Sequence, residues 1–175
     1  EVMEFFGYAC VHCYNFDPIL ADWVQEKGGS IKFIQTPAIS SKYWRLLGQN
    51  FLTYQELGEH DKYHTPFFRA VHAGGRAFTD PESLSEFYEQ LGGEKQAYIN
   101  AFNSVGVASE LSKADNMARR LKVAMVPSIV IQGKYLVRTS GSVGPKRMLD
   151  VMDYLLAKEL AERSNNEPQK EAQKN

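Results

Sequence analysis

The sequence predicts an α/β fold in which a mixed β-sheet is interrupted by an inserted all-helical domain. Strand and helix patterns alternate at the start of the chain, only helical patterns occupy residues 41–122, and two strands and a helix follow. These two later strands join at Gly133 in a tight hairpin, which makes them antiparallel. A purely parallel, doubly wound sheet is therefore excluded.

The first half of the expected sheet consists of a strand, a helix and a second strand. Residues 2–7 form a short aromatic-rich strand, and residues 31–36 alternate apolar and polar side chains. Between them, residues 10–27 carry apolar side chains at three- and four-residue spacings, which predicts a helix ended by a pair of glycines. Pro18 lies inside this helix and predicts a kink or an early break.

Glycines separate the helical patterns in the middle of the chain. Asp80 and Pro81 provide an N-cap followed by proline at the first helical position. The middle of the chain is therefore expected to contain five helices, at 41–56, 62–73, 81–91, 94–104 and 109–122. The second half of the sheet and a last amphipathic helix are expected at 128–132, 134–139 and 146–163.

This order of elements divides the chain into two domains and a tail. Residues 1–40 and 123–163 are expected to form the sheet domain, and residues 41–122 the helical insertion. Residues 164–175 contain one alanine and no other apolar side chain, which predicts a disordered tail. Because the chain already begins in the pattern of a core strand, we expect further residues upstream.

Composition excludes several classes of protein. Twenty Lys and Arg against 21 Asp and Glu give a net charge of −1, which argues against a nucleic-acid binder. No apolar run approaches the roughly 18–20 residues that span a bilayer, and no signal peptide is visible. The two cysteines are too few for a small secreted fold stapled by disulfides.

Both cysteines lie in the motif Cys10-Val11-His12-Cys13, where a strand ends and a helix begins. Cys10 faces the unpaired N–H groups and the positive end of the helix dipole, whereas Cys13 lies one turn inside. We therefore expect Cys10 to be the exposed, attacking sulfur and Cys13 the buried, resolving one. His12 would stabilise the Cys10 thiolate further.

Other interpretations of the motif remain open. Zinc needs about four ligands, and there is no second CxxC. His60 and His64 have helical spacing, but they lie far beyond zinc-finger distance from Cys13. These two histidines and His72 are expected to be surface or helix-packing residues, and no metal site is predicted. Two ordinary buried cysteines are the remaining alternative.

Val126 and Pro127 stand immediately before the returning strand. A cis Val126–Pro127 bond facing the two cysteines would leave the Val126 backbone free to pair with an extended substrate segment. It would also keep metals away from Cys10. The alternative is a trans proline that merely begins an edge strand.

These residues resemble those of the DsbA family of thiol:disulfide oxidoreductases, which have a thioredoxin-like fold with a helical insertion. The resemblance is carried by four segments that span nearly the whole chain: Glu4-Phe5-Phe6, Cys10 through Phe16, Val126-Pro127-Ser128 and Gly133-Lys134-Tyr135. It implies an enzyme that donates its Cys10–Cys13 disulfide to folding secreted or periplasmic proteins, with no cofactor beyond this disulfide.

The resemblance also implies partners and a location. The expected partners are reduced unfolded proteins and a DsbB-type membrane quinone reductase that reoxidises the enzyme. The expected location is the periplasm of a Gram-negative bacterium, and the enzyme is expected to be a monomer. The family's N-terminal strand is missing here, and the missing N-terminus could carry a membrane anchor.

The chain departs from the family pattern at two positions. Family members commonly have Pro-His between the cysteines, where this chain has Val11 and His12. Oxidising character is expected to survive with an altered potential. Glu4 matches the acidic residue below the active site, but its usual lysine partner is replaced by Gln35. The pairing of Glu4 and its role in proton transfer are therefore left open, with water as the alternative partner.

Four other functions compete with the oxidase. Glutathione-dependent relatives usually lack the second cysteine, so Cys13 argues against them. Isomerases generally add a dimerisation domain, for which 175 residues leave no room, while a reductase is close in chemistry. A non-enzymatic holdase could use the helical insertion and the last helix, with Met148 and Met152, as an apolar peptide-binding face.

Overall fold

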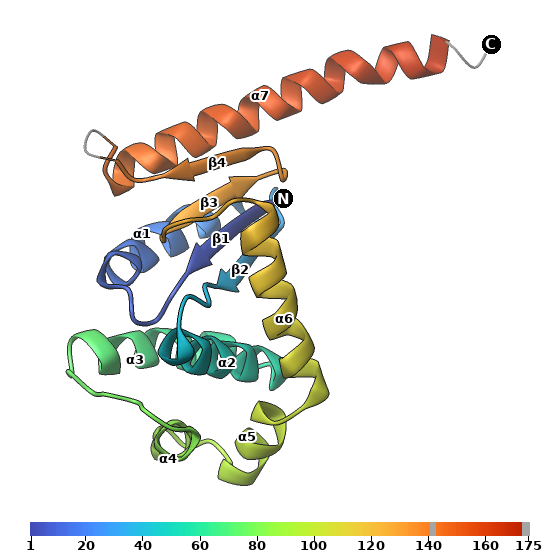
Figure 1. Cartoon of the computed structure of the whole chain (residues 1–175). Helices are drawn as coiled ribbons and strands as arrows, with labels where there is room; N and C mark the ends of the chain where they lie inside the picture. The colour runs from blue at the N-terminus through green and yellow to red at the C-terminus, as the bar shows by residue number, and fades with distance from the viewer. Residues whose placement is uncertain (141–142, 173–175) are drawn as a thin grey trace.

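The computed structural model describes residues 1–140 and 143–172, and only the backbone of residues 165–172. Its centre is a four-stranded sheet in the order β2-β1-β3-β4 (Figure 1). β1 pairs in parallel with β2 and antiparallel with β3, and β3 pairs antiparallel with β4. The predicted mixed sheet is confirmed. The strands are β1 (Val2–Phe6), β2 (Phe33–Pro37), β3 (Ser128–Ile131) and β4 (Tyr135–Arg138).

The hairpin between β3 and β4 turns at Gln132 and Gly133. Their φ angles are 52° and 66°, in the left-handed region that glycine adopts without steric cost. The turn closes with the N–H of Lys134 donating to the carbonyl of Ile131 at 2.9 Å. The expected tight hairpin at Gly133 is therefore present.

One face of the sheet is covered by α1 (Val11–Lys27) and α7 (Pro145–Ala172). Apolar side chains of the two helices share one core with β1, β3 and β4; they include Phe16, Leu20, Trp23, Met148 and Met152. Helix α1 continues past Pro18 to Lys27, so the early break does not occur. Packing of the helix on both sides of Pro18 offsets the lost backbone hydrogen bond.

The opposite face of the sheet packs against α6 (Val105–Arg120). Met3, Phe5 and Val130 form a small core there with residues from the end of α6 and the segment that follows it. In Figure 1, α6 runs from the other helices of the insertion back to the sheet. It therefore connects the insertion to the strands that complete the sheet.

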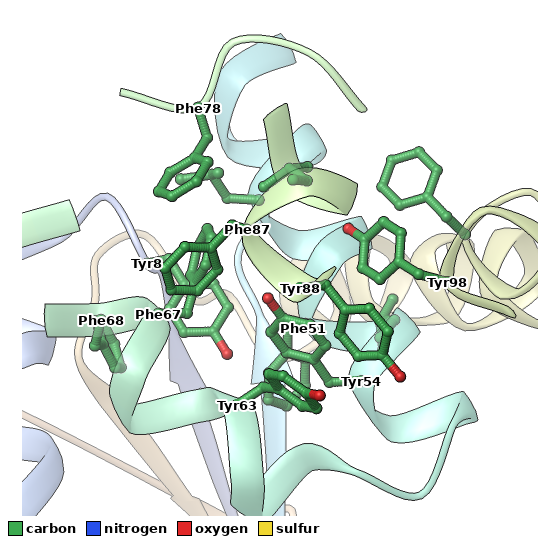
Figure 2. Close-up of a cluster of buried hydrophobic side chains, with 14 of the residues drawn as sticks. Tyr8, Phe51, Tyr54, Tyr63, Phe67, Phe68, Phe78, Phe87, Tyr88 and Tyr98 are labelled. Atoms are coloured by element: carbon green, nitrogen blue, oxygen red, sulfur yellow. The ribbon is translucent and has the colours of Figure 1, made fainter. Parts of the chain in front are cut away.

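Between β2 and β3 the chain forms only helices. Four precede α6: α2 (Lys42–Glu56), α3 (His60–His72), α4 (Pro81–Gln90) and α5 (Lys95–Phe102). Their core is rich in aromatic rings, with neighbouring centroids such as those of Tyr63 and Tyr88 4.5 Å apart (Figure 2). This core also contains Phe6, Tyr8, Cys10 and Cys13, so it reaches the predicted active site.

Two helix ends differ from the prediction by more than two residues. Helix α6 begins at Val105 rather than at residue 109, because Ser104 caps it and accepts the N–H of Val107 at 3.0 Å. Helix α7 continues to Ala172, where a disordered tail is predicted from residue 164; extending a packed helix avoids the cost of nucleating a new one. The predicted disorder of residues 173–175 lies outside the described residues. The domain boundaries 1–40 with 123–163 and 41–122 stay a prediction.

Candidate active site

The two cysteines lie at the start of α1, directly after the loop that leaves β1. Cys10 is the N-cap residue, with extended backbone angles, and its sulfur accepts the N–H of Cys13 at 3.1 Å. The N–H of Cys10 donates to the carbonyl of Gly7 at 3.0 Å, which closes the preceding loop. The sulfur of Cys10 therefore occupies the position of a helix-capping acceptor.

The two sulfurs differ in environment. Cys10 is 9% exposed and Cys13 1%, so the expected order of exposure is found although both residues are buried. Cys10 is followed directly by the exposed residues Val11 and His12. A partner approaching from solvent reaches Cys10 before Cys13.

The pKa of the Cys10 thiol is lowered from 9.0 to about 6. The hydrogen bond with the Cys13 side chain contributes most, burial opposes it, and the N–H groups of Cys13 and His12 and the charge of His12 lower the pKa further. The pKa of Cys13 is raised far above its usual value, chiefly by burial and then by Cys10. The site therefore favours a thiolate at Cys10 and a thiol at Cys13.

Glu4 is buried near enough to the thiols to interact with their charges, and it has an amide as its hydrogen-bond partner. It is 1% exposed, and the Gln35 Nε2 donates to its Oε2 at 2.8 Å across the β1–β2 pair. Burial raises the pKa of Glu4 from 4.5 to about 8 against the opposing effect of this hydrogen bond. Among the described residues Glu4 makes no ion pair, so Gln35 satisfies the carboxyl group without supplying charge.

The Val126–Pro127 peptide bond is cis, the first of the two alternatives that the sequence leaves open, and it lies beside Cys10. The Cys10 thiol donates to the carbonyl oxygen of Val126 at 3.7 Å, a long contact appropriate to sulfur. After the proline, the Ser128 hydroxyl donates to the carbonyl of Met125 at 2.7 Å and closes the turn into β3. Two segments more than a hundred residues apart therefore meet at the attacking sulfur.

Two histidines of the insertion also contact the segment before Cys10. Both ring nitrogens of His64 are engaged, Nδ1 with the hydroxyl of Tyr8 at 2.8 Å and Nε2 with the carboxylate of Asp17 at 2.9 Å. His72 donates from Nε2 to the carbonyl of Tyr8 at 2.8 Å. The sequence predicts only surface or packing roles for these histidines, because nothing in it links α3 to Tyr8.

His60 has a more limited set of contacts. Its Nδ1 lies 3.1 Å from the carboxylate of Asp61, and its Nε2 is buried without a partner in the described part of the chain. With Asp17 and His64 it lines a groove of about 860 Å³ along β2, which includes neither cysteine. Within the described residues, no group of three or more His, Cys, Asp and Glu side chains could hold a metal ion.

Comparisons with known proteins show which family the chain is similar to. The DSBA-like thioredoxin domain family matches residues 20–155. The chain is 36% identical over 159 residues to the thiol:disulfide interchange protein DsbA of Azotobacter vinelandii, covering 91% of this chain and 74% of that one. The DsbA of Pseudomonas aeruginosa is 32% identical over 161 residues, covering 92% of this chain and 76% of that one.

Solved structures agree with the sequence comparisons. The crystal structure of Pseudomonas aeruginosa DsbA superimposes with a TM-score of 0.89 at 31% identity, covering 93% of this chain and 85% of that one. The structure of DsbA from Xylella fastidiosa gives a TM-score of 0.84 at 29% identity, covering 91% and 86%. The chain therefore belongs to the DsbA family of thiol:disulfide oxidoreductases, with the thioredoxin-like fold and helical insertion that its residues predict.

Proposed function

We propose that the Cys10–Cys13 disulfide oxidises pairs of thiols in reduced, unfolded proteins through a mixed disulfide at Cys10. The carrying observation is the contrast between the two sulfurs: Cys10 has a pKa lowered to about 6 at a helix N-cap, whereas Cys13 is buried with a raised pKa. A sulfur of low pKa is a good leaving group. This favours release of Cys10 as a thiolate, and with it transfer of the disulfide to the substrate.

The reaction balances in two exchanges. A substrate thiolate attacks the Cys10 sulfur, the Cys10–Cys13 bond breaks, and Cys13 takes the electron pair and a proton. A second substrate thiolate then attacks the substrate sulfur of the mixed disulfide, and Cys10 leaves as a thiolate. The substrate loses two electrons and forms its disulfide, while the enzyme becomes the dithiol.

Glu4 is the proposed proton donor in the first exchange. With a pKa of about 8 it carries a proton at pH 7, and its charge when ionised raises the pKa of Cys13. A Cys13 thiolate and a Glu4 carboxylate therefore disfavour each other. Passing the proton from Glu4 to Cys13 avoids two negative charges in this buried position.

The Val126 backbone is the proposed contact for the substrate chain. Its carbonyl lies 3.7 Å from the Cys10 sulfur, so a peptide that places a cysteine at Cys10 passes alongside Val126. Backbone groups bind extended peptides through main-chain hydrogen bonds that do not depend on the peptide's side chains, which suits an enzyme that acts on many unfolded proteins. Pro127 and Val11 are proposed to flank the same approach.

The setting of the reaction is inferred from the family. We propose a periplasmic location in a Gram-negative bacterium and reoxidation of the dithiol by a DsbB-type membrane quinone reductase, because the similar proteins are named DsbA in such organisms. Among the described residues no helix is both long and apolar enough to cross a membrane. An anchor upstream of Glu1 stays a prediction.

A peptide-oxidation assay tests the proposal. The oxidised protein, mixed with a reduced peptide that carries two cysteines, should lose its disulfide as the peptide gains one. Cys10→Ser and Cys13→Ser should each abolish the exchange, because neither variant can form the Cys10–Cys13 disulfide. When Cys10 of the Cys13→Ser variant first carries glutathione as a mixed disulfide, a peptide with one cysteine should displace the glutathione as a thiolate and stay bound to Cys10. Reduction of insulin without oxidation of the peptide would support a reductase instead. Suppression of aggregation by the protein with both cysteines replaced by serine, without thiol exchange, would support a holdase.

A further inference from the structure

A buried tyrosine connects the active-site loop to the helical insertion. Tyr8 lies two residues before Cys10, is 2% exposed, and packs against the rings of Phe67 and Phe68 on α3 at centroid distances of 4.7 and 4.8 Å (Figure 2). Burial raises the pKa of Tyr8 well above 10, so its hydroxyl keeps its proton. This hydroxyl hydrogen-bonds the Nδ1 of His64, which is itself 5% exposed.

The other ring nitrogen of His64 reaches the far side of the dithiol segment. Its Nε2 lies 2.9 Å from the carboxylate of Asp17, which follows Cys13 by four residues on α1. The imidazole therefore contacts one residue before Cys10 and another after Cys13. His60, one turn earlier on α3, has neither contact and pairs with Asp61 instead.

We propose that His64 is a positioning residue of the dithiol site, because from the insertion it bridges Tyr8 and Asp17, which flank the Cys10–Cys13 segment. The inference rests on the proposed function, since it concerns the same two thiols. His72 supports the same geometry from the last turn of α3 by holding the carbonyl of Tyr8. The insertion is then part of what holds Cys10 in place at the helix N-cap.

The hydrogen bond from His64 to Asp17 also changes the electrostatic environment of Glu4. The carboxylate of Asp17 is one of the groups that raises the pKa of Glu4, and Glu4 in turn raises that of Cys13. A donor on Asp17 withdraws part of this negative field from the Glu4 carboxyl. Without His64, the largely buried Asp17 loses this donor and the loop before Cys10 loses a hydrogen bond to α3. The second loss loosens the N-cap geometry at Cys10 and makes its thiolate less favourable.

The test compares His64→Phe, which keeps a ring and removes both hydrogen bonds, with the intact protein. Two readouts report on the thiolate: the pH midpoint of Cys10 alkylation, and the ratio of reduced to oxidised protein in a fixed glutathione buffer. We expect the midpoint to rise by about half a unit and the ratio to fall about threefold, the same change seen in two ways. His64→Gln, which keeps an N–H for Asp17, should recover part of both shifts.

Tyr63→Phe is the matched control, because it changes the adjacent buried ring on α3, and the Tyr63 hydroxyl hydrogen-bonds neither Tyr8 nor Asp17. It should leave both readouts unchanged. Unchanged readouts in His64→Phe, or equal shifts in Tyr63→Phe, overturn the proposal. Should His64→Phe fail to fold, Tyr8→Phe decides by the same readouts, since it removes one hydroxyl: a raised midpoint supports the bridge and an unchanged one overturns it.

The role of His64 and the proposed function can fail separately. If the intact protein does not oxidise the two-cysteine peptide, the proposed function fails whatever the variants show. If it does, and the variants match it in both readouts, only the role of His64 is lost.

Discussion

Replacing Glu4 by glutamine should stabilise the protein, and the gain should grow with pH. Glu4 is buried with a pKa of about 8, whereas in the unfolded chain it ionises near 4.5. At pH 7 the unfolded chain has released this proton and the folded one has kept it, which costs the fold about 3 kcal/mol. At pH 5 the same difference costs only about 1 kcal/mol. Glutamine avoids both costs and still offers an oxygen to Gln35.

The sign of this pH dependence follows from the direction in which the pKa of Glu4 is shifted. A carboxyl whose folded pKa is raised loses stability as pH rises from the unfolded pKa toward the folded one. Urea unfolding of the oxidised protein at pH 5, 6 and 7 measures the effect, with the intact chain and Glu4→Gln side by side. A gain that is the same at all three pH values, or a Glu4→Gln variant less stable than the intact protein at pH 7, would show that Glu4 is not a buried carboxyl with a raised pKa.

Glu159 is the matched control, because it is a second buried glutamate but its partner, Lys134, is positively charged, whereas the partner of Glu4 is a neutral amide. Lys134 donates to both of its carboxylate oxygens, at 3.0 and 2.8 Å, and this hydrogen bond lowers the pKa of Glu159. Its contribution to stability is present above the unfolded pKa and is lost as pH falls through the folded one. Glu159→Gln should therefore destabilise the protein at pH 7 and have less effect in acid.

Three further predictions follow from the site and its supports. The stability of the reduced protein relative to the oxidised one should rise by about 1 kcal/mol from pH 5 to pH 7, because Cys10 ionises in that interval; unfolding of both redox forms checks it. His12→Ser should reduce that rise, since it removes a charge that lowers the Cys10 pKa; an unchanged rise would leave only hydrogen bonds as the cause. Asp80→Ala should cost about 1 kcal/mol in urea unfolding, because the Asp80 carboxylate caps α4 by accepting the Ser83 N–H at 2.8 Å; no loss would mean that water replaces the cap.

The sequence alone predicts the parts of the fold that depend on local pattern. The cysteine pair at a strand-to-helix junction, the glycine at the β3–β4 turn and the proline before β3 each have a local physical reason for their place. The element order then places the insertion between the two halves of the sheet. The end of α7 is predicted less well, because a polar segment can continue a helix that is packed elsewhere along its length.

The contacts across the site could not be predicted from the sequence. That Gln35 satisfies Glu4 depends on the parallel register of β1 and β2, which spacing along the chain does not determine. The bond from His64 to Tyr8 joins residues 56 positions apart, and it depends on how α3 packs against the loop before Cys10. In the sequence, His64 cannot be distinguished from any other histidine in a helix.

Titration of the Cys10 thiolate in the reduced protein tests whether Cys10 is the activated, attacking sulfur. The ultraviolet absorbance of the thiolate, followed with pH and compared with the Cys10→Ser variant, gives the pKa of that sulfur. We expect a midpoint of about 6 that disappears in Cys10→Ser, with no second thiolate forming below pH 9, because Cys13 is buried and its pKa is raised. A midpoint near the usual thiol value of 9.0, or one that persists in Cys10→Ser, would contradict the assignment of Cys10 as the attacking sulfur.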